Sequence, residues 1–281
     1  MGCNCDCDTT DQEKTVVSQK YLNEIVNVDG IHGMSMLEDK SIDMVLCDLP
    51  YGTTQNKWDV IIPFDQLWKE YTRIIKDNGA IVLTAAQPFT SLLISSNLSM
   101  FRYSLVWDKK NTTGFLNANR MPLRRHEDIV VFYKKLPVYN PQKTDRGSPR
   151  KKGGAGRTNR GCYGEYKDTD TFNNSYYPTS IIEISNADKT KIQHPTQKPV
   201  ELFEYLIKTY SNPGDTILDN CIGSGTTAVA AINTGRSFIG FEIEAAYCQI
   251  ANERISCTNA SVPDLANSVH DTRSIGLSNA I

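Results

Sequence analysis

The sequence predicts an α/β fold in which a central, mostly parallel sheet carries helices on both faces. Short apolar runs of strand length alternate with longer segments whose apolar residues repeat at helical spacing. A glycine-containing turn also lies between one of these runs and the helix that follows it. At 281 residues with 40% hydrophobic residues, the chain is long enough to bury one large core.

The expected elements follow the chain in order. Strands are predicted at residues 24–28, 42–47, 80–84, 103–107, 129–133, 216–218 and 237–241. Helices are predicted at residues 64–75, 89–98, 200–210, 226–233 and 245–255. Asn78-Gly79 is expected to end the first of these helices. Because strand–helix–strand units join strands in parallel, this order favours a sheet that is covered on both sides.

The alternation stops near residue 140, where the chain becomes rich in glycine, proline, small polar and basic residues, and it resumes after residue 192. We therefore expect an insertion at 140–192 between two parts of one domain, 21–139 and 193–255. Residues 1–20 and 256–281 are polar and are predicted to be tails, the first of them flexible.

Composition narrows the class of protein. The formal net charge is −2, and no apolar stretch approaches the roughly 18 residues of a membrane helix. The N-terminus lacks the pattern of a signal peptide, which makes a cytoplasmic location the default. Cys3, Cys5 and Cys7 cluster there, but paired Cys-x-x-Cys motifs are missing and the other cysteines are scattered. We expect neither a disulfide framework nor a metal site.

The turn between residues 216 and 227 is a candidate ligand site. Gly223 and Gly225 let a ligand approach the backbone closely at the start of a helix. The Gly-Lys-Ser/Thr of a P-loop is absent, and Ala228 replaces the third glycine of a dinucleotide fingerprint. Glu242 ends the next strand, where a carboxylate can accept hydrogen bonds from ribose hydroxyls. The alternative is an ordinary strand–helix corner with a surface glutamate.

Asp48–Gly52 (DLPYG) follows another apolar strand and suits a different chemistry. An exocyclic amine on an aromatic base is a weak nucleophile because its lone pair is delocalised into the ring. Hydrogen-bond acceptors on its N–H groups, here the Asp48 carboxylate and the Pro50 carbonyl, would free that lone pair. Tyr51 offers a ring on which a flipped base can stack. The alternative is a Pro-Tyr-Gly turn with a capping aspartate.

Three motifs in this order resemble the DNA amino-methyltransferases, and specifically their circularly permuted beta group. They are Asp48–Gly52, His194–Pro199 (HPTQKP) and Asp219–Thr227 (DNCIGSGTT). Residues 49–59 are also similar to phage-type adenine methylases. The resemblance covers most of residues 20–255. It implies a Rossmann-like S-adenosylmethionine-dependent methyltransferase fold in which the insertion recognises the target, with S-adenosylmethionine as cofactor and double-stranded DNA as substrate.

The resemblance also implies roles for individual residues. The target-base site would consist of Asp48, Leu49, Pro50 and Tyr51. The cofactor site would consist of Asp29, Thr196, Gln197, Lys198, Asp219, Gly223, Gly225, Thr226 and Glu242, with Lys198 beside the methionine carboxylate. Asp29 ends a strand that should neighbour the strand ending in Glu242, where it would accept from the adenine of the cofactor. Leu49 departs from the usual proline, but its side chain need not touch the base. Aspartate at position 48 favours adenine N6, because serine is commoner in cytosine N4 enzymes.

Transfer is expected by direct displacement at the sulfonium methyl group, since no cysteine follows a proline as in cytosine C5 enzymes. The alternatives are N4-cytosine methylation, methylation of RNA or a small molecule, and a non-catalytic DNA-binding protein on the same scaffold. A homodimer, a restriction endonuclease partner and a bacterial or phage origin are further expectations by analogy.

DNA contact is expected from two basic groups. One carries seven basic residues against the single acid Asp145: Lys143, Arg146, Arg150, Lys151, Lys152, Arg157 and Arg160. The other is Arg120, Arg124, Arg125 and His126. The alternative for His126 is a structural histidine at the start of a strand. Phosphate contacts by such groups make binding dependent on salt. The alternative for the first group is a solvated charge run.

Overall fold

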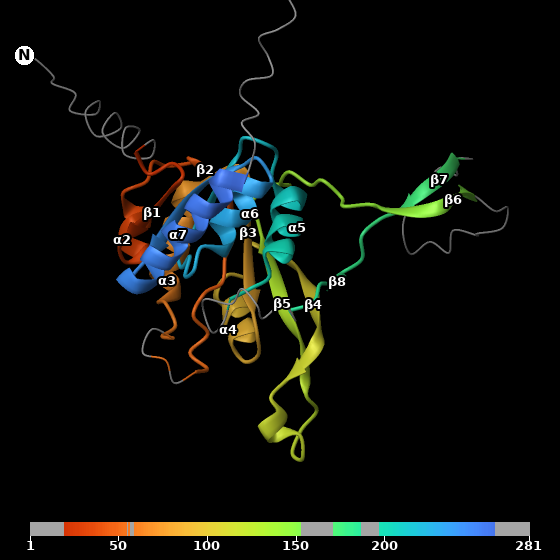
Figure 1. The fold of residues 1–281 in the computed structure, drawn as a ribbon, viewed down its shortest axis with the longest axis horizontal. Coiled ribbons are helices and arrows are strands. Elements are labelled where there is room, and N and C mark those ends of the chain that lie inside the picture. Colours follow the sequence, from red (N-terminus) through yellow and green to blue (C-terminus); the bar gives the residue numbers. More distant parts are fainter. Residues whose placement is uncertain (1–19, 55, 57–58, 153–170, 187–196, 262–281) are drawn as a thin grey trace, which may run out of the picture.

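The computed structural model describes residues 20–54, 56, 59–152, 171–186 and 197–261, and it has an eight-stranded sheet at its centre (Figure 1). In spatial order the strands are β1 (Glu24–Asn27), β10 (Ser237–Glu242), β9 (Thr216–Asp219), β2 (Ile42–Cys47), β3 (Ile75–Ala85), β5 (Arg124–Phe132), β4 (Phe101–Thr113) and β8 (Ile181–Glu183). Every neighbouring pair is parallel except the two that involve β5.

Helices cover both faces of this sheet, which confirms the predicted fold class. On one face lie α2 (Gly30–Ser35), α3 (Phe64–Ile74) and α4 (Phe89–Ser96), whose apolar side chains share a core with β2 and β3. On the other lie α5 (Val200–Tyr210), α6 (Thr226–Asn233) and α7 (Ala245–Ser261), which form a second core. The central strands β2, β9 and β10 are largely buried on both sides because each face packs against a helical layer.

The chain order fixes where ligands can bind. From β2 the chain passes through α3 to β3 on one side, and from β9 it passes through α6 to β10 on the other. β2 and β9 are neighbours, with Met44 paired to Ile217 and Val45 to Leu218. The strand order therefore reverses between β2 and β9. Open α/β sheets bind ligands in the crevice at such a reversal, outside the carboxyl ends of the strands.

The prediction that Asn78-Gly79 ends a helix was wrong. Helix α3 ends at Ile74, and β3 begins at the next residue and contains both. A Cβ atom on Gly79 would lie 2.6 Å from the carbonyl oxygen of Asp43 on β2. Glycine is needed here because two strands approach closely at a register shift between Ile42 and Met44. An Asn-Gly pair looks the same in the sequence whether it ends a helix or allows this close approach.

Strands β4 and β5 are longer than the apolar pattern predicts. They continue beyond β3 as an exposed two-stranded arm that carries a short 3-10 helix, η1 (Phe115–Asn117), near its tip (Figure 1). Every residue from Lys110 to His126 is exposed. Neither side of this ribbon packs on a core, so it has no alternating apolar pattern to recognise.

The predicted insertion is only partly separate from the main sheet. A second, two-stranded sheet of β6 (Thr144–Lys152) and β7 (Thr171–Tyr176) projects from the domain (Figure 1). Strand β8, also within 140–192, pairs with β4 and extends the main sheet. Helix α7 runs to Ser261 and so passes the expected start of the C-terminal tail at residue 256. No helix in the described part of the chain is long and apolar enough to cross a membrane.

Candidate active site

Asp48 lies directly after β2, at the strand reversal. Leu49 is buried in the core between the helical layer and the sheet. The side chain that replaces the usual proline therefore anchors the motif to the core. Because a buried neighbour fixes its backbone, Asp48 is held at the carboxyl edge of the sheet with its side chain partly exposed.

Three side chains donate hydrogen bonds to the Asp48 carboxylate. The hydroxyl groups of Tyr51 (2.7 Å) and Thr84 donate to Oδ1. The ammonium group of Lys198 donates to Oδ2 at 2.7 Å. Thr84 comes from the end of β3, and Lys198 from the segment before α5. Two of the three groups that fix the carboxylate thus come from parts of the chain that are distant from Asp48.

Lys198 belongs to a cluster of four charges. Its Nζ also lies 3.5 Å from Oε2 of Glu127, while Oε1 of Glu127 accepts a hydrogen bond of 3.1 Å from Lys109. Both lysines are almost fully buried. Burial alone lowers the pKa of Lys198, but the carboxylates of Asp48 and Glu127 outweigh it and the pKa is raised. Two cations facing two anions can remain charged out of water.

This geometry places Lys198 differently from the expectation. The resemblance put its ammonium group beside the cofactor's methionine carboxylate, whereas the structure puts it on Asp48. Its position nevertheless joins the target-base motif to the predicted cofactor motif, because the preceding residue Gln197 accepts a hydrogen bond of 3.3 Å from Ser224 in the glycine turn. The methionine-carboxylate role stays a prediction.

Tyr51 is packed on one side. Its ring stacks on Phe89, with centroids 5.1 Å apart and planes inclined by 22°. Burial, followed by the charges of Asp48 and Glu127, raises the pKa of the phenol, so it stays protonated and donates to Asp48. The Lys198 ammonium group also lies over this ring, 5.5 Å from its centroid. A base must therefore stack where Phe89 and this cation leave the ring open.

Asp59 organises the loop after the motif and was missed by the sequence reasoning. Its carboxylate accepts hydrogen bonds from the backbone N–H groups of Gly52 (2.8 Å), Thr53 (2.9 Å) and Thr54 (2.6 Å). Burial raises its pKa, but these hydrogen bonds and one from the Thr54 hydroxyl have the larger combined effect and lower it. The ionised side chain holds the chain that leaves Tyr51 in one conformation.

The glycine turn has the backbone that a ligand cradle needs. Gly223 and Gly225 have φ angles of +53° and +82°, which favour glycine. A Cβ atom on Gly223 would meet no described atom within 4 Å, so space is open in front of it. Gly225 is the N-cap of α6, and the N-terminus of that helix faces the same edge of the sheet. These residues fit an extended polar cofactor.

Glu242 closes this turn from the neighbouring strand. Its Oε2 accepts from the N–H of Gly223 and its Oε1 from the N–H of Glu244, both at 2.8 Å. Burial raises the pKa of the carboxyl group, although the two backbone hydrogen bonds act in the opposite direction. A carboxylate has about four acceptor positions, so room remains for ribose hydroxyls.

The other predicted cofactor residues are distributed around the turn. Asp219 is buried and accepts hydrogen bonds from the Thr227 hydroxyl and the Cys221 N–H, so it supports the turn from behind. Thr226 is the buried first residue of α6. Asp29 caps α2 through the N–H of His32 (3.0 Å), and it follows the strand that pairs with β10, as predicted. Thr196 lies outside the described residues.

The predicted DNA contacts fall on the two projecting ribbons. Lys143 and Arg146 lie over the rings of Tyr177 and Tyr176 near β6 and β7. Arg150, Lys151 and Lys152 belong to β6, while Arg157 and Arg160 lie outside the described residues. On the β4–β5 arm, Arg120, Arg124 and Arg125 are exposed, and Arg125 forms a bidentate ion pair of 2.7 Å with Asp108.

Comparison with known proteins identifies the family of this chain. A family model described as DNA methylase, N6/N4 type, matches residues 42–253. The chain belongs to this DNA methylase family. It is 28% identical to the type II methyltransferase M.HpaI of Haemophilus parainfluenzae over 242 residues, covering 81% of this chain and 72% of that protein. It is 27% identical to M1.MboII of Moraxella bovis, covering 82% and 95%.

Solved structures show the same methylase fold. M1.HpyAVI, crystallised as a complex with S-adenosylmethionine, aligns with a TM-score of 0.59 and 24% identity over 83% of this chain and 98% of that one. The cytosine-N4-specific PvuII methyltransferase aligns with a TM-score of 0.60 and 15% identity over 84% and 90%. The family match supports the expected cofactor, S-adenosylmethionine, and methylation of DNA; it leaves the choice between adenine and cytosine open.

Proposed function

We propose that this DNA methylase transfers a methyl group from S-adenosylmethionine to the N6 amino group of adenine in double-stranded DNA. The observation that supports it best is the carboxylate at Asp48, held by Lys198, Thr84 and Tyr51 at the strand reversal. A fixed carboxylate is a strong acceptor for an amine N–H. In the family that the sequence resembles, aspartate at this position is typical of adenine enzymes.

The residues divide the chemistry between them. Asp48 and the Pro50 carbonyl accept from the amine of a flipped base, and Tyr51 stacks on its ring. The amine must displace or share a donor that now occupies Asp48, and the ion pair with Lys198 holds the carboxylate in place while this happens. When bound, S-adenosylmethionine supplies an electrophilic methyl group. As the amine takes the methyl group, the sulfur–methyl bond would break, the cofactor would leave as a neutral thioether, and the Asp48 carboxylate would accept the proton that the amine loses.

The cofactor site is proposed around the glycine turn. The open space at Gly223, the helix start at Gly225 and the carboxylate of Glu242 support it. Glu242 accepts from the ribose, Asp29 from the adenine of the cofactor, and Gln197 lies beside the methionine end with its neighbours Thr196 and Lys198. Asp219 and Thr226 support this turn.

The remaining predictions are part of the same proposal. The basic residues of the two ribbons contact DNA phosphates, with the segment 140–192 as the region that recognises the target. A cytoplasmic location, where the DNA of a bacterial or phage-infected cell lies, follows from this substrate. A homodimer and a paired restriction endonuclease remain expectations by analogy with the family.

Identifying the modified base tests this function. Purified protein is incubated with unmethylated plasmid DNA and S-adenosylmethionine carrying a labelled methyl group, and the DNA is digested to nucleosides for mass spectrometry. N6-methyladenine supports the proposal. N4-methylcytosine would replace it with the cytosine alternative, for which the fold of the PvuII enzyme is a precedent. If the protein binds DNA but neither binds the cofactor nor transfers a methyl group, it is a non-catalytic DNA-binding protein on this scaffold. Sequencing the methylated plasmid then gives the recognition site.

A further inference from the structure

The β4–β5 arm, defined as Lys110–His126, has an exposed apolar tip that phosphate contacts by its basic residues do not explain. We propose that its tip is a wedge that inserts Phe115 and Leu116 between bases of duplex DNA beside the target, which holds the duplex open while the base is flipped. This inference rests on the proposed function and adds a device for opening the substrate.

The tip exposes large apolar side chains that a free surface does not favour. Phe115 is 78% exposed, Leu116 82% and Met121 54%. Single exposed apolar residues are ordinary, but adjacent ones at the end of a projecting ribbon indicate a binding surface. Proteins that kink DNA use phenylalanine, leucine, isoleucine, methionine or proline as wedges between base steps.

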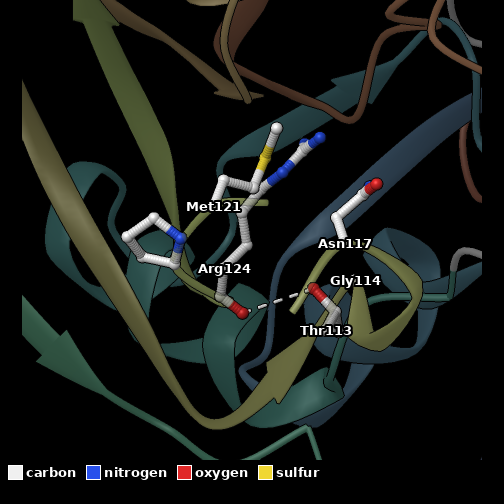
Figure 2. A pocket seen from close by; sticks show the side chains of 6 residues that line it. Thr113, Gly114, Asn117, Met121 and Arg124 are labelled. Atoms are coloured by element: carbon white, nitrogen blue, oxygen red, sulfur yellow. Dashed lines mark hydrogen bonds between the residues drawn. The ribbon is translucent and has the colours of Figure 1, made fainter. Parts of the chain in front are cut away.

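The tip has a defined conformation. The N–H of Asn117 donates to the carbonyl of Gly114 (2.9 Å), and the N–H of Arg120 donates to that of Asn117 (2.8 Å). The two strands are joined at the base of the turn, where Thr113 pairs with Arg124 and its hydroxyl donates to the Arg124 carbonyl (Figure 2). An ordered turn presents its apolar residues without first losing conformational entropy on binding.

A hollow of about 210 Å³ opens beside this turn, and it is lined by Met121, Pro122, Arg124, Asn117, Thr113 and Gly114 (Figure 2). Its lining combines apolar groups with amide, hydroxyl and guanidinium groups. Such a mixture suits the edge of a base, which presents hydrogen-bonding atoms and, in thymine, a methyl group.

The charge of the arm selects DNA as the partner. Residues 110–126 contain Lys110, Arg120, Arg124 and Arg125 and no acidic residue. Ion pairs with Glu183 and Asp108 occupy Lys110 and Arg125, whereas Arg120 and Arg124 flank the apolar tip. A second copy of the arm would bring these like charges together, while a polyanion gains from both of them.

The arm projects from the edge of the sheet that carries the candidate active site. Strand β4 runs parallel to β2 and β3, so it leaves the sheet at their carboxyl ends, where Asp48 lies. Glu127 at the base of the arm lies 3.5 Å from the same Lys198 ammonium group that binds Asp48. DNA that reaches Asp48 therefore meets the arm.

The reach of the arm is sufficient. The last residue of β3 that pairs with β5 is Ala85, opposite Asp128. From Asp128 to Arg124 the strand advances by roughly 13 Å at about 3.3 Å per residue, and the turn extends further. This reach exceeds the depth of both grooves of B-DNA, which is about 8.5 Å for the major groove and about 7.5 Å for the minor groove.

The test compares paired and pre-opened substrates. Unmethylated duplex oligonucleotides that contain the recognition site are prepared with the target base either correctly paired or mismatched. The double variant Phe115→Ala/Leu116→Ala is compared with Leu98→Ala/Leu136→Ala, which removes two similarly exposed side chains outside the arm. The rate of methyl transfer is measured in single turnover at saturating enzyme, and the oligomeric state of each variant by sedimentation.

We expect the arm variant to lose about ten-fold in rate on the paired duplex and less than about two-fold on the mismatched one, because opening a mismatch costs less. The control variant should match the wild type on both. An equal loss on both duplexes, no loss on either, or a changed oligomeric state that accounts for the loss would overturn the wedge. If the wild type itself methylates no amine in paired DNA, the proposed function fails instead.

Discussion

The candidate site has two corners, one around Asp48 and one at the glycine turn around Gly223, and they are built in different ways. Around Asp48, side chains from β3, β5 and the segment before α5 meet in a buried cluster of ion pairs and hydrogen bonds. Around Gly223, the chain's own backbone makes the site, through positive φ angles and N–H groups that donate to one carboxylate. The first corner therefore depends on charge and the second on conformation, and substitutions can separate the two.

The largest effect is expected from Asp48→Ala. Loss of the fixed acceptor should lower turnover by about a thousand-fold, while the affinity for S-adenosylmethionine changes little, because the glycine turn does not depend on this carboxylate. Methyl incorporation and calorimetric titration of the cofactor measure the two properties. Turnover close to that of the wild type would refute the role of Asp48, and a parallel loss of cofactor affinity would show that the corners are not independent.

Lys198→Met tests the charge cluster. It leaves Asp48 without its cation and should lower turnover by about a hundred-fold, and it should destabilise the fold by about 3 kcal/mol because buried anions lose a partner. The matched control is Lys109→Met, which contacts Glu127 but not Asp48 in the structure. It should show a similar loss of stability in chemical denaturation with a much smaller loss of turnover. Equal losses of turnover would mean that contact with Asp48 is not what matters.

Gly223→Ala tests the backbone corner. At φ +53° the alanine should cost about 1 kcal/mol of stability, and its methyl group should enter the open space and weaken cofactor binding by about ten-fold. Gly235→Ala is the control, since Gly235 also has a positive φ and an added Cβ there would meet no described atom within 4 Å, but it lies in the turn before β10. Only the first variant should bind the cofactor more weakly.

The smallest effect concerns pH. Burial raises the pKa of Asp219 to about 6, although the hydrogen bonds from Thr227 and Cys221 lower it. The folded state thus holds this proton more tightly than the unfolded chain, so stability falls as the pH rises toward and through 6. Between pH 5 and pH 8 this group should reduce the unfolding free energy by about 1 kcal/mol. Asp219→Asn should remove that part of the pH dependence, and an unchanged slope would contradict the assignment.

The sequence by itself determined the fold class, most helices and strands, and the two motif corners. These features are local: apolar periodicity, a glycine turn and a carboxylate after a strand each lie within a short window. It also determined that Asp29 follows a strand beside the one ending in Glu242, because parallel strand–helix units leave few arrangements.

The tertiary structure alone decided which side chains meet at Asp48. Thr84, Glu127 and Lys198 are far from it in the chain and carry no pattern of their own, so only the packing of β3, β5 and the segment before α5 brings them together. It also decided that β4 and β5 continue into an exposed arm and that Gly79 permits close strand packing. Pairing between distant segments and exposure of a ribbon on both sides leave no periodic pattern of apolar residues in the sequence. For this physical reason only the tertiary structure reveals the cluster at Asp48 and the arm.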